Sequence, residues 1–129
     1  MNNDSHYSGK TIALGQNVPS IELKTTLQGK HKRAAANAIV DSGATGNLIN
    51  QELVKKHRIK EHRLLNNIEL INADGSKGAI TSRVYLQMTL QKGKGYHTEK
   101  ITFYVGDIGS HDIIPVSYTH LTLPTKRIV

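Results

Sequence analysis

The chain has no cysteine, no tryptophan and only three prolines among its 129 residues. The lack of cysteine excludes disulfides and zinc sites built on thiolates, and it is compatible with a reducing environment. No apolar run approaches the roughly 20 residues that a membrane-spanning helix needs. The polar residues 1–4 are followed by no apolar run, so we see no signal peptide. We therefore expect an intracellular, cytoplasmic protein with no membrane partner.

The chain is basic but poor in aromatic residues. Its net charge is +7, and Lys and Arg gather at residues 30–33 and 55–63. One interpretation is a small basic β domain that binds RNA. We favour a solvated basic face, because the six aromatic residues are not interleaved with the basic ones, as a base-stacking surface requires. Nucleic acid is thus not an expected partner of this domain.

The seven histidines raise the question of a metal site. His57 and His62 are five residues apart, which differs from the i, i+4 spacing of a helical zinc site. No cysteine is present to complete such a site. We therefore expect ordinary surface histidines, with no metal and no cofactor.

The most informative stretch is an apolar run that ends in an aspartate. Residues 38–40 are Ala-Ile-Val, and a hydroxyl residue and a glycine follow the aspartate directly. Asp, Ser and Gly also favour plain turns. The apolar residues before the aspartate and the Ala-Thr-Gly after the glycine favour a catalytic loop at the end of a buried strand. The candidate loop residues are Asp41, Ser42, Gly43, Ala44 and Thr45.

This stretch resembles the active-site loop of the retropepsin-like aspartic proteases, particularly those of Ty3/gypsy-type LTR retrotransposons. The similarity runs from about Pro19 to Ile114. Further matching segments follow in the same order, at residues 47–50, 72–75, 96–103 and 107–114. The resemblance implies a mostly β, closed-barrel protomer with a flap hairpin and one short helix. It also implies aspartic endopeptidase activity on an extended peptide or polyprotein.

Aspartic proteases need two carboxylates that share one proton, one to activate water and one to protonate the substrate. Of the five aspartates in this chain, only Asp41 has the apolar lead-in and the hydroxyl-glycine pair. A chain of 129 residues is too short for two such lobes. The simplest second carboxylate is Asp41 of an identical chain, which predicts a two-fold homodimer. By resemblance, Ser42 braces the paired loops, and Gly43 and Ala44 line the peptide site.

Local patterns predict a chain of strands and one helix. A half-buried strand is expected at residues 21–27, and further strands at 34–40, 68–71, 80–90 and 101–105. A short helix is expected from Gln51 to Arg58, with Asn50 as its N-cap. The clearest two-residue period places one face of the long strand in the core, formed by Ile80, Ser82, Val84, Leu86, Met88 and Leu90.

The turn before the long strand matches the family's flap by position. The flap assignment rests on resemblance, and the alternative is a simple hairpin turn. A flap would exclude water and contact the backbone of an extended peptide. The candidate flap residues are Ala73, Asp74, Gly75, Ser76, Lys77, Gly78 and Ala79.

The sequence predicts three segments. Residues 1–18 are interpreted as a loose leader or linker, 19–114 as the protease domain, and 115–129 as a tail outside the family pattern. Family members continue past the Asp-Ile-Ile motif with an apolar residue and a glycine, whereas Pro115 follows here. We interpret the tail as foreign to the fold, and a divergent native terminus is the alternative. A catalytically inactive retropepsin-fold peptide-binding or scaffold fragment is therefore an alternative function.

Overall fold

The structure is a computed structural model that describes residues 7–15, 20–41 and 43–116. It is mostly β, as the sequence predicts. In chain order the elements are β1 (Tyr7–Ala13), β2 (Ser20–Gln28), β3 (Arg33–Asp41), β4 (Leu48–Asn50), α1 (Gln51–Lys56), β5 (His62–Ile71), β6 (Lys77–Lys92), β7 (Gly95–Gly106) and β8 (Ile113–Ile114).

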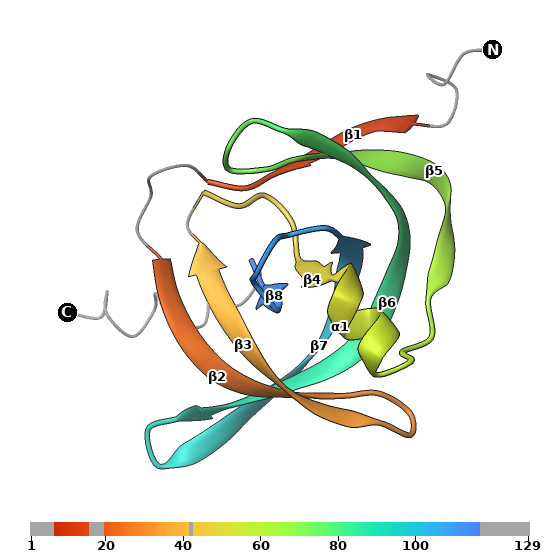
Figure 1. The fold of residues 1–129 in the computed structure, drawn as a ribbon. Helices are drawn as coiled ribbons and strands as arrows, with labels where there is room; N and C mark the ends of the chain where they lie inside the picture. Colours follow the sequence, from red (N-terminus) through yellow and green to blue (C-terminus); the bar gives the residue numbers. More distant parts are fainter. Residues whose placement is uncertain (1–6, 16–19, 42, 117–129) are drawn as a thin grey trace.

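Six of the strands close into a barrel, which confirms the predicted fold class. The sheet order is β1-β5-β6-β2-β3-β8-β4-β7, and β6 also pairs with β7, so the sheet closes on itself (Figure 1). β1 and β5 lie outside this ring and extend it from β6. β5 and β6 form a hairpin that we call the outer hairpin. The longest strand, β6, therefore belongs to both the barrel and the outer hairpin.

The barrel core follows the predicted alternation of β6. All six residues of the predicted face are buried, and Ser82 is the one polar member. Phe103 of β7 is fully buried and packs in the same cluster as Val84 and Met88 of β6. Burial of these alternate side chains stabilises the barrel, because each removes apolar surface from water.

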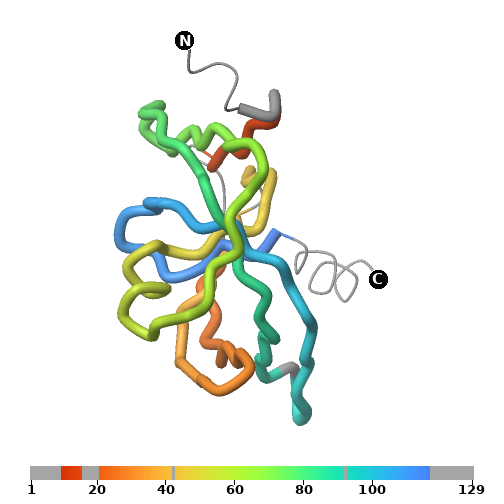
Figure 2. Tube along the Cα trace, turned by 90° about the vertical axis from the view of Figure 1, so that its right-hand side faces the viewer, coloured from red at the N-terminus to blue at the C-terminus, as the bar shows by residue number. Residues whose placement is uncertain are grey.

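A second core lies between the outer hairpin and the predicted catalytic loop. Ile12 of β1, Leu70 of β5, Ile80 of β6 and Leu48 of β4 all belong to it. Figure 2 places β1 and the β5–β6 turn at one end of the molecule, with the β2–β3 and β6–β7 hairpins at the other. This second core holds the outer hairpin over the end of β3.

Helix α1 confirms the predicted N-cap. The side-chain oxygen of Asn50 accepts the backbone N–H of Glu52 at 2.9 Å. The helix ends at Lys56 rather than at residue 58, because Arg58 has a left-handed φ of 51° that turns the chain out of the helix. None of the helical structure in the described ranges is long and apolar enough to cross a membrane.

The N-terminal segment differs from the expected loose leader. Residues 7–13 form β1, which runs parallel to β5 with Ile12 opposite Leu70. The side chain of Ile12 is buried in the second core, which explains why this polar segment is ordered there. The rest of the predicted leader, residues 1–6 and 16–18, lies outside the described residues.

The beginning of the predicted tail contacts the domain. Pro115 is buried, and the N–H of Val116 donates to Oδ1 of Asn47 at 2.6 Å. Val116 also packs against the second core. Residues 117–129 lie outside the described residues. The interpretation of the tail as foreign to the fold therefore stays a prediction for that segment.

Candidate active site

Asp41 is the last residue of β3 and is 9% exposed. The alternation of β3 leads into it: Ala36, Ala38 and Val40 are buried in the barrel core. Ile39, on the opposite face, packs against the second core. The strand therefore delivers the Asp41 carboxylate to the boundary between the two cores, at the edge of the barrel.

Both carboxylate oxygens of Asp41 accept backbone hydrogen bonds. The N–H of Gly43 donates to Oδ1 at 2.8 Å, and the N–H of Gly15 donates to Oδ2 at 3.2 Å. The N–H of Ala44 donates to the main-chain oxygen of Asp41 at 3.1 Å and closes the turn. These backbone contacts hold the carboxylate in one orientation.

The rest of the predicted catalytic loop packs against β1. The N–H of Thr45 donates to the carbonyl of Ala13 at 3.0 Å, and Oγ1 of Thr45 accepts the N–H of Ala13 at 2.9 Å. Ala44 is buried. A side chain at Gly46 would meet Ile12, because an added Cβ would lie 2.8 Å from its Cδ1. Ser42 lies outside the described residues, so its predicted bracing role stays a prediction.

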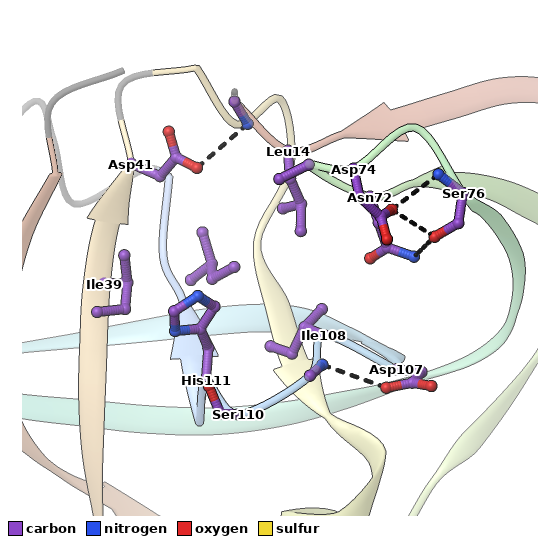
Figure 3. Close-up of a pocket in the computed structure, with 14 residues that line it drawn as sticks. Leu14, Ile39, Asp41, Asn72, Asp74, Ser76, Asp107, Ile108, Ser110 and His111 are labelled. Atoms are coloured by element: carbon purple, nitrogen blue, oxygen red, sulfur yellow. Dashed lines mark hydrogen bonds between the residues drawn. The ribbon is translucent and has the colours of Figure 1, made fainter. Parts of the chain in front are cut away.

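Asp41 opens onto a pocket of about 580 Å³. Figure 3 shows Asp41 and the β5–β6 turn on opposite sides of this pocket, with Leu14 between them. The lining comes from the end of β3, the turn, residues 14–15 and the segment after β7, through its loop 107–111 and Ile114. The pocket therefore combines a nearly buried carboxylate with walls that belong to four separate parts of the chain.

The predicted flap residues form the β5–β6 turn and the start of β6. The N–H of Asn72 donates to the carbonyl of Ser76 at 2.8 Å and closes the turn. Gly75 has a φ of 90°, a conformation that favours glycine. Ala73, Asp74 and Ser76 line the Asp41 pocket, whereas Gly75 does not. The remaining predicted residues, Lys77, Gly78 and Ala79, pair with β5 at residues 69–71.

The Asp74 carboxylate is held within this turn. Its Oδ1 accepts the hydroxyl of Ser76 at 2.6 Å and the N–H of Ser76 at 2.8 Å. These hydrogen bonds favour the charged form, the hydroxyl most strongly, and lower the pKa of Asp74 below its ordinary value. Asp74 therefore keeps its negative charge in mild acid.

Sequence reasoning missed two parts of the pocket wall. Leu14 and Gly15 belong to the segment interpreted as a leader, and the loop 107–111 was identified only as part of a segment that matches the family, with no role at the pocket. The loop is positioned by Asn50, whose Nδ2 donates to the carbonyls of Gly109 and His111 at 2.8 Å each. No local pattern in the sequence marks this contact, because the burial that requires partners for the donors of the Asn50 amide is visible only in the structure.

Within the described ranges, no group of three His, Cys, Asp or Glu side chains is placed to hold a metal ion. The polar side chains that line the pocket with Asp41 are two carboxylates, the hydroxyls of Ser76 and Ser110, the amide of Asn72 and the imidazole of His111. The chemistry that these residues offer is proton transfer and hydrogen bonding.

The model of the PEG10/RTL1 protease domain matches residues 37–115, more than half of the chain. The chain belongs to the PEG10/RTL1 protease domain family. This family is retropepsin-like and derives from the Ty3/gypsy retrotransposon Gag-Pol, so the resemblance inferred from the sequence is confirmed. The family match contains Asp41, the turn at residues 72–76 and the loop 107–111, and it leaves out β1. No curated protein and no solved structure matches the chain.

Proposed function

We propose that the chain is one protomer of a homodimeric aspartic endopeptidase that processes a polyprotein. The observation that carries the proposal is Asp41, a nearly buried carboxylate at the end of β3 that opens onto a pocket within the protease-family segment. Its position at the edge of the barrel suits a site completed by a second chain. The proposal retains the intracellular, cytoplasmic retroelement setting expected from the sequence.

Two Asp41 carboxylates, one from each chain, would share a single proton, since two like charges so close together do not both ionise easily. The ionised carboxylate takes a proton from water as the water oxygen bonds to the scissile carbonyl carbon. The protonated carboxyl gives its proton to the carbonyl oxygen. The resulting gem-diol collapses as a proton passes to the amide nitrogen, the C–N bond breaks, and an acid and an amine leave.

The other two aspartates at the pocket are poor candidates for the second carboxylate of one chain. Asp74 accepts two hydrogen bonds from Ser76, and Asp107 accepts the N–H of Gly109 at 3.2 Å. Each therefore stabilises its own turn, and neither has a hydrogen bond to Asp41 among the contacts described for them. This supports a second copy of Asp41 as the partner, with Ser42 bracing the paired loops as the resemblance implies.

The walls of the pocket suit an extended peptide. The β5–β6 turn lies across the pocket from Asp41, and an extended peptide can bind by adding its main chain beside a strand. Closure of this turn over the peptide would exclude water from the carboxylate pair. The substrate class is therefore an unfolded or extended stretch of polypeptide.

The test compares three isosteric variants of the full chain, Asp41→Asn, Asp74→Asn and Asp107→Asn. Cleavage of a fluorogenic peptide library is measured at about pH 4–6, where one proton per carboxylate pair is expected. Asp41→Asn should lower kcat/KM by roughly a thousandfold or more, since it removes acid–base catalysis. Asp74→Asn and Asp107→Asn should retain cleavage. Cleavage that survives Asp41→Asn refutes the mechanism, and loss of cleavage in Asp107→Asn would point to a carboxylate pair within one chain.

A further inference from the structure

Residues 11–15, the end of β1 and the two residues after it, lie between the predicted catalytic loop and β5, the first strand of the predicted flap hairpin, which we call the flap stem. On one side, the N–H of Leu14 donates to the carbonyl of Ile71 at 3.0 Å. On the other side, Ala13 and Thr45 exchange two hydrogen bonds, of 2.9 and 3.0 Å. Residues 11–15 thus bridge β5 and the catalytic loop through main-chain groups, as an added strand does.

The segment is anchored by one buried side chain. Ile12 is 4% exposed and packs with Ala44, Leu70 and Ile80 in the second core. Gly46 leaves the space that Ile12 fills, since an added Cβ would lie within 3.1 Å of three of its atoms. This fit holds the segment in one register against the loop that carries Asp41.

The end of the segment reaches the carboxylate itself. The N–H of Gly15 donates to Oδ2 of Asp41 at 3.2 Å, the dashed contact at Asp41 in Figure 3. Leu14 and Gly15 also form part of the pocket wall. The other oxygen, Oδ1, is taken by Gly43. Each oxygen of the candidate catalytic group therefore already accepts a backbone N–H from its own chain.

We propose that residues Thr11–Gly15 form a strap that occupies part of the peptide groove and competes with substrate for it. An extended peptide laid between the flap stem and the catalytic loop needs main-chain partners from both sides, and the strap uses the carbonyl of Ile71 and the N–H of Thr45. Substrate then enters by displacing the strap, beginning at Gly15 and Leu14 and continuing back towards Thr11. This inference rests on the proposed protease function and names the chain's own N-terminal segment as the regulator of that site.

A reversible cross-link tests the strap in the full chain. Ala13 and Ile71 are directly opposed in the β1–β5 pairing, and the native chain has no cysteine that would interfere. Opposed strand positions are within the reach of a disulfide. In the double variant Ala13→Cys/Ile71→Cys, oxidation locks the strap to the flap stem, and reduction releases it in the same protein. A matched control is Thr89→Cys/Thr98→Cys, an opposed pair of the β6–β7 strands outside the pocket lining.

The readout is binding of a fluorescent statine peptide, a transition-state analogue of aspartic proteases, together with cleavage of the fluorogenic peptides. Oxidation should weaken binding and slow cleavage at least tenfold in the strap variant and leave the control unchanged. A second variant, Gly15→Pro, removes the N–H that reaches Asp41 and also fixes the φ angle of residue 15. It should raise kcat/KM by roughly threefold to tenfold, as expected for loss of one competing hydrogen bond.

Three outcomes separate the inference from the function on which it rests. Weaker binding only in the oxidised strap variant supports the strap. Equal binding in both redox states, with no gain in Gly15→Pro, overturns the strap and leaves the protease proposal standing. The third outcome is that neither binding nor cleavage is detected in the native chain, in the oxidised or reduced strap variant, or in Gly15→Pro. That outcome overturns the protease function together with the strap.

Discussion

The side-chain amide of Asn50 donates to the carbonyl oxygen of His111 at 2.8 Å. The same amide nitrogen donates to the carbonyl of Gly109, and the amide oxygen caps α1. One buried side chain therefore ties the start of the helix to the loop that forms a wall of the Asp41 pocket. The shape of the pocket depends on a residue that does not line it.

Asn50→Asp is expected to destabilise the domain by about 2–4 kcal/mol. The carboxylate keeps the capping acceptor but replaces both donors, so an anion faces two carbonyl oxygens at a buried position. Urea unfolding followed by circular dichroism measures the change. The matched control is Asn66→Asp, the same chemical change at an exposed position of β5. Equal stability of the two variants would contradict the role assigned to Asn50.

Leu48→Ala and Leu65→Ala make the same substitution at opposite extremes of burial. Leu48 is 0% exposed in the second core, and Leu65 is 97% exposed on β5. Truncation of Leu48 should cost about 2–5 kcal/mol of unfolding free energy, from lost burial and the cavity it leaves. Truncation of Leu65 should change stability by no more than about 0.5 kcal/mol. A large loss at Leu65 would mean that another surface covers it in solution.

The β5–β6 turn should weaken in strong acid. Because hydrogen bonds from Ser76 lower the pKa of Asp74 below its ordinary value near 3.8, the turn is stabilised above that value. This stabilisation is lost as the pH falls through the lower pKa of the folded state. A carboxyl ¹³C NMR titration should show Asp74 titrating below its ordinary value. Ser76→Ala should return the pKa towards that value, whereas Ser110→Ala, at another exposed serine, should leave it unchanged.

Subunit mixing tests whether the active site is shared. When equal amounts of the native chain and Asp41→Asn are mixed and allowed to exchange, random pairing leaves about one quarter of the dimers with two aspartates. Activity per total protein should therefore fall to about one quarter of that of the native chain alone. Sedimentation equilibrium verifies that both chains form dimers under the assay conditions. A fall to about one half would mean that each chain works alone.

Much of the barrel was predictable because the relevant interactions are local in sequence. The two-residue alternation of β6 identified its buried face, and the Asn50 cap identified the start of α1. Asp41 was recognisable because the apolar strand before it and the glycine after it are adjacent in the chain. Such patterns reflect the pleat of one strand or the first turn of one helix, and they need no knowledge of distant partners.

The rest depends on contacts between distant residues. β1 is polar apart from Ile12 and Ala13, and it becomes a strand because Ile12 finds a space beside Gly46, 34 residues away. The hydrogen bond from Gly15 to Asp41 spans 26 residues and leaves no periodic signal. The loop 107–111 reaches the pocket because Asn50 holds it there. At residues 7–13, tertiary packing overrides the polar character on which the leader interpretation rested.

The 16-residue strand β6 has a mechanical consequence. Its first residues pair with β5 and continue the β5–β6 turn, and its last residues pair with both β2 and β7 in the barrel. The strand therefore crosses from the predicted flap at the pocket into the wall of the barrel. On our proposal that the turn closes over substrate, its movement has to bend or twist β6, so the stiffness of the barrel sets the work of opening the site.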